Sequence, residues 1–387
     1  MPILNRAAEL QAEATEWRRH LHESPEILYE VTNTAAFVAE RLKEFGVDEI
    51  VTGIGRTGVV GIIKGRGESD RTIGLRSDMD ALPVDEVTGK PWASKIPGRM
   101  HACGHDGHMA MLLGAAKYLA ETRNFNGRVA VIFQPAEEGG AGALAMVEDG
   151  LMERFGISEV YGMHNMPGIP AGQFAIRKGG IMAAPDKFTI TVTGRGSHAA
   201  QPNRSIDPIV IGAQIVSNLQ LIASRNVDPI ESVVLSITKF IAGTTHNVIP
   251  TEAELAGTVR TLSEAVQDQT EARMQQIVES IAAAHGAVGV LHYERNCPVT
   301  ANHDAEMGHA LAVAREVAGP TNVDPDVAPS MAGEDFAFML KKRPGAFIFI
   351  GNGESAGLHN PAYDFNDDII GSGISYWVRL AEQRLTD

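Results

Sequence analysis

The stretch Met-His-Ala-Cys-Gly-His-Asp-Gly-His-Met-Ala-Met-Leu-Leu-Gly-Ala-Ala-Lys-Tyr-Leu, residues 100–119, joins a cluster of metal-binding side chains to an apolar segment. Its first nine residues hold three histidines and Cys103, one of only two cysteines. Thiolate and neutral imidazole bind borderline-soft divalent metals well. By itself this part also fits a buried cysteine among solvent-exposed histidines. Residues 109–119 are apolar and contain several alanines, so they predict a buried helix.

Short apolar runs flank this stretch and predict the rest of a sheet. Residues 59–63, 72–75 and 129–133 are bounded by glycines and have the length of buried strands. Residues 4–46 have helical character, and Asn33 is expected to cap a helix over residues 34–45. The pattern predicts an α/β fold with a central, mostly parallel sheet flanked by helices. The chemical motifs follow the predicted strand ends, where α/β proteins usually place their sites.

A different order of elements begins after residue 179. Alternating or apolar runs predict strands, and longer amphipathic stretches predict helices. The resulting order, strand-helix-strand-strand-helix-strand, is that of a ferredoxin-like α+β layer. We therefore expect a discontinuous catalytic domain of residues 1–181 and 295–387, with an inserted lid and dimerisation domain of residues 182–294. The expected elements of the insert are residues 187–192, 206–223, 233–240, 252–260, 263–285 and 288–293.

Composition restricts the partners and the compartment. A chain of 387 residues fits two or three domains, and its net charge of −15 disfavours nucleic acid and anionic membranes as partners. No stretch approaches the roughly 18 apolar residues of a membrane span. Residues 1–13 lack a basic region followed by an apolar run, so we expect no signal peptide. Two cysteines are too few for a disulfide framework, which favours the cytoplasm.

Acidic and imidazole side chains gather after the predicted strands. Asp78 and Asp80 are two apart, so in extended chain they project to one side as metal ligands or as partners of a ligand imidazole. Glu137 and Glu138 follow the strand at 129–133. If that segment is extended, they point to opposite sides, so one binds metal while the other takes a proton from water. His164 and His359 are further candidate ligands, each following a separate short segment.

The predicted insert carries three side chains suited to holding an amide substrate. His198 lies on a glycine-flanked turn, and Asn247 and Arg260 follow later in the insert. A histidine and an amide polarise a carbonyl, and an arginine grips a carboxylate. Taken alone, these residues also fit a plain turn and a strand-end arginine.

Other sites are disfavoured by their context. Residues 53–58 match the string G-x-G-x-x-G, but an apolar strand follows them instead of the helix that a dinucleotide site requires. The chain has no H-E-x-x-H helix or P-loop, and its G-x-S-x-G string at residues 353–357 runs into Leu-His-Asn-Pro instead of the helix that a nucleophile elbow requires. A nucleotide-binding protein, a serine hydrolase and a single-zinc protease of the H-E-x-x-H type are therefore not expected.

These clusters, in this order, resemble the dinuclear metallopeptidase family of aminoacylases and carboxypeptidases. The likeness is greatest to its amidohydrolase branch, which includes hippurate hydrolase, N-acyl-amino-acid amidohydrolases and auxin-conjugate hydrolases. In the wider family a His-x-Asp ligand motif stands where this chain has Asp78-Met79-Asp80. The matching motifs are residues 18–26, 75–83, 100–108, 133–138, 331–336 and 363–367.

The resemblance implies two divalent metal ions, Zn²⁺ or Mn²⁺, with Co²⁺ and Ni²⁺ also compatible. Cys103 is then a bridging thiolate, and Asp80 lies behind the ligands instead of touching the metal. Whether Asp78 or Asp80 contacts the metal stays open at this point. The implied ligands are Cys103, His105, Glu138, His164 and His359.

The resemblance also implies the roles of the remaining candidates and the substrate. Glu137 corresponds to the general base, and His198 to a residue that stabilises the oxyanion, often in the partner's site of a homodimer. Asn247 and Arg260 lie in motifs linked to substrate binding. The expected substrate is a small N-acyl-L-amino acid. A dipeptidase or carboxypeptidase, an N-acetyl-diaminopimelate deacetylase, and a non-catalytic metal-binding protein of the same fold remain the alternatives.

Overall fold

The computed structural model describes residues 4–386; residues 1–3, which belong to the segment assessed for a signal peptide, and residue 387 lie outside it. The chain forms two compact units. The first consists of residues up to 181, residues 300–328 and residues from 335 onward. The second consists of residues 182–299 and 329–334.

The first unit is built on an eight-stranded sheet in the order β1-β2-β4-β3-β5-β16-β6-β15. Its centre is parallel, since β3 pairs in parallel with β4 and β5, and β5 pairs in parallel with β16. The α/β class with a mostly parallel sheet is thereby confirmed. The strands are β1 (Glu49–Ile54), β2 (Gly58–Lys64), β3 (Thr72–Asp78), β4 (Arg128–Gln134), β5 (Ile157–Pro167), β6 (Phe174–Ala175), β15 (Val323–Asp324) and β16 (Gly345–Gly353).

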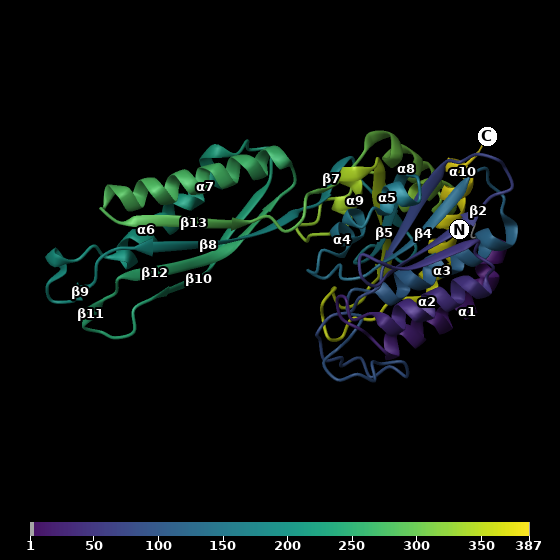
Figure 1. The fold of residues 1–387 in the computed structure, drawn as a ribbon, viewed down its shortest axis with the longest axis horizontal. Helices are drawn as coiled ribbons and strands as arrows, with labels where there is room; N and C mark the ends of the chain where they lie inside the picture. The colour runs from purple at the N-terminus through teal and green to yellow at the C-terminus, as the bar shows by residue number, and fades with distance from the viewer. Residues whose placement is uncertain (1–3, 387) are drawn as a thin grey trace. The chain divides into compact units, whose positions relative to one another are not determined.

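Helices cover both faces of this sheet (Figure 1). In β2, a Cβ on Gly58 would lie 2.8 Å from Met146 of α4, and one on Gly61 would lie 3.0 Å from Leu42 of α2. Residues three apart on a strand face opposite sides, so α2 and α4 lie on opposite faces. The helices are α1 (Asn5–Glu23), α2 (Thr32–Glu44), α3 (His105–Thr122), α4 (Gly142–Glu148), α5 (Leu151–Arg154), α8 (Asp304–Ala318), α9 (Ala337–Lys342) and α10 (Ile370–Arg384).

Two helix starts differ from the sequence prediction. Helix α3 begins at His105, earlier than predicted, so His105 and His108 of the predicted metal-binding motif lie in its first turn and Cys103 precedes it. Helix α2 begins at Thr32, and Asn33 lies inside it without capping it. The Glu26 carboxylate instead accepts the backbone N–H groups of Asn33 and Thr34, at 3.3 and 2.8 Å. A side chain from outside the helix thus satisfies its first donors.

The second unit is an α+β layer. Its antiparallel sheet has the order β10-β12-β8-β13, and α6 and α7 pack against the sheet (Figure 1). This is the predicted ferredoxin-like arrangement. The elements are β8 (Ala184–Thr193), β9 (Ser197–His198), α6 (Pro208–Leu221), a π-helical turn (Ile222–Asn226), β10 (Val233–Ala242), β11 (Val248–Ile249), β12 (Glu252–Thr261), α7 (Glu264–Ala284) and β13 (Val288–Glu294).

Short elements complete the described chain. β7 (Gly179–Met182) pairs with β14 (Thr300–Asn302), and 3-10 turns lie at Pro202–Arg204, Pro320–Asn322 and Asp367–Ile369. Among residues 4–386, no helix combines the length and the apolar character that crossing a membrane requires.

A buried charge pair ties α1 to the start of α3. His22 is 1% exposed, and its Nδ1 lies 2.7 Å from the Asp106 carboxylate while its Nε2 lies 3.2 Å from that of Glu86. Burial alone lowers the pKa of His22, but the charge of Asp106 and the hydrogen bonds that His22 donates to Asp106 and Glu86 raise it to about 9. His22 therefore stabilises the fold as a cation.

This pair predicts a pH dependence of stability. Because the folded pKa exceeds the unfolded value of 6.5, the contribution of His22 is complete below pH 6.5 and is lost as the pH rises through 9. The shift corresponds to about 3 kcal/mol. We expect His22→Asn to be less stable than the wild type at pH 7, with the difference narrowing toward pH 10. Urea unfolding of both metal-free proteins measures this, and a constant difference would contradict it.

Candidate metal centre

The candidate ligands come from one edge of the first unit's sheet. The parallel strands β3, β4, β5 and β16 end at this edge. Each strand carries a candidate acidic or imidazole side chain near its end, or is followed by one. The loop that enters α3 lies beside them, since the His359 N–H donates to the Ala102 carbonyl at 2.8 Å. Strand ends thus explain why residues distant in sequence meet here.

The structure brings all five predicted ligands together. Cys103, Glu138 and His359 offer atoms within 4.8 Å of one another. His359 Nε2 lies 3.2 Å and His105 Nε2 lies 4.0 Å from Glu138 Oε1. His164 Nε2 lies 3.3 Å from Cys103 Sγ.

Backbone carbonyls orient two of these imidazoles. His105 Nδ1 donates to the Asp80 carbonyl at 2.7 Å, and His164 Nδ1 donates to the Asn165 carbonyl at 2.6 Å. In both rings Nε2 is left toward the cluster, as in metal-binding histidines held by a carbonyl. His105 Nε2 is buried and has no hydrogen-bond partner within the described residues. A set of sulfur, nitrogen and carboxylate donors around such an atom fits divalent metal.

The electrostatics of the cluster favour a cation. His359 has its pKa raised to about 10, through contacts with Cys103 and Glu138. Burial lowers the pKa of His105, yet Asp78 and its other neighbours hold that pKa well above the usual value. Burial raises the pKa of the Cys103 thiol. Burial and the neighbouring histidines hold the pKa of His164 well below its usual value. The acids beside His105 and His359 thus place negative charge there, which a divalent ion would balance.

Glu137 and Glu138 lie in a turn, so the expected extended segment is wrong. Ala136 has a left-handed backbone with φ of 53°. Asp80 stabilises the turn, because its two carboxylate oxygens accept the N–H groups of Glu137 and Glu138 at 2.9 and 3.1 Å. Asp80 therefore lies behind the two glutamates, and burial raises its pKa. The partners are 57 and 58 residues apart, too far for a local sequence pattern to indicate this bond.

The remaining candidates lie in the second unit, and they do not all meet there. His198 in β9 pairs with β11, and the Ala199 N–H donates to the Asn247 carbonyl, so His198 and Asn247 are neighbours. His198 and Glu252, the first residue of β12, line one open pocket. Arg260 lies eight residues further along β12, about 26 Å away at strand spacing, against the Val259 carbonyl.

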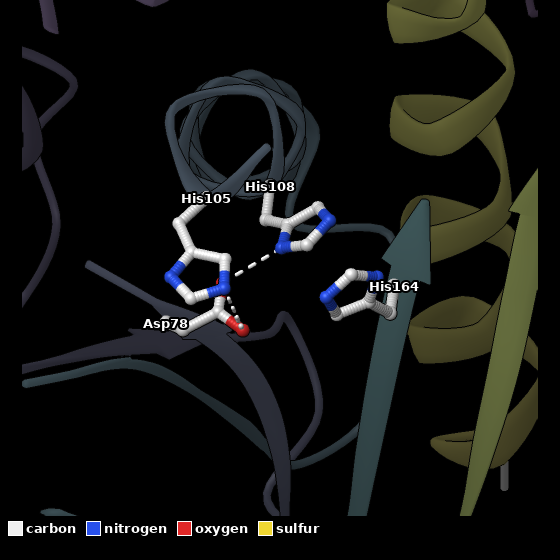
Figure 2. A group of neighbouring side chains, drawn as sticks. All are labelled: Asp78, His105, His108 and His164. Atoms are coloured by element: carbon white, nitrogen blue, oxygen red, sulfur yellow. Dashed lines mark hydrogen bonds and ion pairs between the residues drawn. The ribbon is translucent and has the colours of Figure 1, made fainter. Parts of the chain in front are cut away.

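Sequence reasoning did not select His108. Figure 2 shows it beside Asp78, His105 and His164, with dashed lines joining Asp78 to His105 and His108. All four side chains are buried, and one atom of each lies within 4.8 Å of the others. The available signal was the spacing of three residues between His105 and His108, which places both on one face of a helix.

The chain is similar to several known proteins. Residues 74–383 match the family described as peptidase family M20/M25/M40. The chain is 44% identical to hippurate hydrolase of Campylobacter jejuni, over 98% of this chain and 99% of the relative. It is 44% identical to an N-acyl-L-amino acid amidohydrolase of Geobacillus stearothermophilus, over 76% and 80%. A dinuclear metal binding M20 peptidase from Bacillus subtilis superposes with a TM-score of 0.87 at 35% identity, covering 98% and 99%.

The two cysteines provide a matched test of the metal centre. Cobalt bound to a thiolate gives a charge-transfer absorption that carboxylate and imidazole ligands lack. We expect Co²⁺ added to the metal-free protein to give this absorption, Cys103→Ser to abolish it, and Cys297→Ser to leave it intact. Absorption titrations of the three proteins measure the effect. Retention of the band in Cys103→Ser would exclude Cys103 as a ligand.

Proposed function

Because the chain belongs to the peptidase family M20/M25/M40 and is a metal-dependent amidohydrolase, we propose that it hydrolyses N-acyl-L-amino acids to a carboxylic acid and a free amino acid. The observation that carries the proposal is the convergence of five candidate metal ligands beside Glu137 in a chain so similar to hippurate hydrolase. The proposed compartment is the cytoplasm, where reducing conditions keep the Cys103 thiol free for metal.

The proposed ligands are the five converging residues, which would hold two divalent ions, Zn²⁺ or Mn²⁺, with Co²⁺ and Ni²⁺ compatible. Asp80 would support them from behind. Bound divalent metal lowers the pKa of water to near 7 and polarises a carbonyl. The five are Cys103, His105, Glu138, His164 and His359.

Glu137 is the proposed general base. One of its carboxylate oxygens takes a proton from the attacking water as the new C–O bond forms, and returns that proton to the nitrogen as the C–N bond breaks. No covalent intermediate with the protein is required. The backbone of Glu137 is fixed by Asp80, so the carboxylate starts from a defined position.

His198 is the proposed donor to the oxyanion. Its Nδ1 accepts the Ala200 N–H at 3.0 Å, so in the neutral ring the proton resides on Nε2. An Nε2–H group is a suitable donor to a tetrahedral oxyanion. Asn247 and Arg260 are proposed to hold the substrate. Glu252 lines the pocket of His198, and the separation of eight residues along β12 between Glu252 and Arg260 is compatible with His198 and Arg260 serving different sites of a dimer.

The decisive experiment is hydrolysis of N-benzoyl-glycine, N-acetyl-methionine, N-acetyl-diaminopimelate and a dipeptide panel by protein refilled with Zn²⁺, Mn²⁺ or Co²⁺. We expect metal-dependent release of amino acid from the first two. Glu137→Gln is expected to keep its metal and lose about 10²- to 10⁴-fold in kcat, while the adjacent Glu138→Gln binds less metal.

Each other outcome selects an alternative. Cleavage confined to dipeptides or to the diaminopimelate derivative would replace the proposed substrate class on the same site. Metal binding without hydrolysis of any substrate would indicate a non-catalytic protein. A Glu137→Gln variant with nearly full activity would remove Glu137 from the mechanism.

We also propose a homodimer that forms through the second unit. β10 is an edge strand, and the apolar side chains Phe240 and Ile241 on it are 40% and 54% exposed. Val210 and Leu221 on α6 are 54% and 46% exposed. The two elements adjoin, since a Cβ on Gly212 of α6 would lie 2.8 Å from Phe240. An apolar edge of this kind favours association with a second copy.

The opposite edge of the same sheet supplies the control for this dimer. We expect Ile241→Lys to shift the protein toward monomer, because it places a charge in the proposed interface. Val288→Lys on β13, at a position 62% exposed, should leave the dimer intact. Light scattering during size-exclusion chromatography measures both masses. A monomeric wild type, or a fully dimeric Ile241→Lys variant, would contradict the interface.

A further inference from the structure

His108 is a buried imidazole whose two ring nitrogens are both occupied. Its Nε2 accepts the Asn165 backbone N–H at 2.9 Å and lies 3.0 Å from the Asn165 side-chain amide nitrogen. An N–H donor requires a lone pair on Nε2, so the ring proton resides on Nδ1 and is donated to Asp78 at 2.7 Å. His108 is therefore neutral and has no lone pair left for a metal.

Asp78, the other end of this bond, is held equally firmly. One carboxylate oxygen accepts from His108, and the other accepts from Arg76 Nη1 at 2.9 Å. Arg76 is buried in β3 and also donates to Gln134 of β4 at 2.8 Å. Asp78 thus joins His108 to the central sheet, although both residues have an atom within 4.8 Å of atoms of His105 and His164.

Asn165 carries this anchorage to two of the proposed ligands. Its side-chain amide donates to the Cys103 carbonyl at 2.7 Å, and its backbone carbonyl accepts from His164 Nδ1 at 2.6 Å. The Tyr363 hydroxyl donates to Asn165 Oδ1 at 2.7 Å. Asn165 is therefore hydrogen-bonded to both Cys103 and His164, whose Sγ and Nε2 atoms lie 3.3 Å apart.

Gly104 makes this close approach sterically feasible. It has φ of 86°, and a Cβ at this position would lie 2.3 Å from the Asn165 amide nitrogen and 2.5 Å from the Tyr363 hydroxyl. Only a glycine leaves the amide room to reach the Cys103 carbonyl.

We propose that His108 is a positioning residue of the metal centre. Held on Asp78 as a neutral imidazole, it fixes Asn165 and thereby sets the separation of Cys103 and His164. It is not itself a ligand. The inference rests on the proposed function, in which Cys103 and His164 bind metal. It adds to that function a residue that holds the two ligands in place through Asn165.

Two conservative variants test the contacts of the two ring nitrogens of His108 separately. His108→Asn keeps a donor near Nδ1 for Asp78 but has no acceptor for Asn165. His108→Gln keeps an acceptor near Nε2 but has no donor for Asp78. We expect His108→Asn to bind Co²⁺ about 10- to 100-fold more weakly, with a smaller thiolate charge-transfer band. His108→Gln keeps the contact with Asn165 and loses only the contact with Asp78, so it should be weakened less than His108→Asn in both measurements.

The other outcomes overturn the proposal. Loss of one bound ion per chain in both variants would make His108 a ligand. Two variants with wild-type binding, or with equal weakening, would show that the contact with Asn165 does not set the site. A wild type that binds no metal is a distinct result, since it refutes the proposed metal centre itself.

A measurement on the unaltered holoprotein does not depend on the folding of a variant. In protein with ¹⁵N-labelled histidine and bound ¹¹³Cd²⁺, we expect His105 and His164 to couple to cadmium through Nε2. His108, assigned through bonds from its own backbone, should carry its proton on Nδ1 and show no coupling. Cadmium coupling at His108, or a proton on Nε2, would overturn the inference.

Discussion

The metal centre depends on the hydrogen bonds that Asp80 accepts inside the protein. Its carboxylate accepts the N–H groups of Glu137 and Glu138, and its backbone carbonyl accepts from His105. A buried carboxylate is costly without such donors, so the end of β3, the turn after β4 and the start of α3 are held together. One residue that need not touch the metal therefore fixes the backbone of a proposed base and the orientation of two proposed ligands.

The sequence was sufficient for much of the fold. Strands β2, β3 and β4 are buried on both faces, so they appear as short apolar runs, and the buried helix α3 lies between two of them. The second unit alternates in β8 because only one face of its sheet packs on helices. The convergence of the ligands followed from a general rule, since parallel strands end at a common edge.

The rest depends on hydrogen bonds between distant residues, which no local pattern contains. Glu26 replaces Asn33 as the acceptor at the start of α2, and Asp80 bends the segment of Glu137 away from extended chain. The task of His108 depends on Asn165, 57 residues away. Periodicity reports which face of an element is buried, whereas these bonds specify which polar groups inside the protein are paired.

The glycine between Cys103 and His105 limits both the transfer of this site to another protein and the substitutions that this position can accept. Any other residue at position 104 would bring a side chain against the amide that spans the two ligand segments. A Cys-x-His pair grafted into another scaffold would supply the donor atoms without their spacing, unless the glycine and a facing amide were transferred with it. Within this fold, the position that contributes no side chain is thus among the least replaceable.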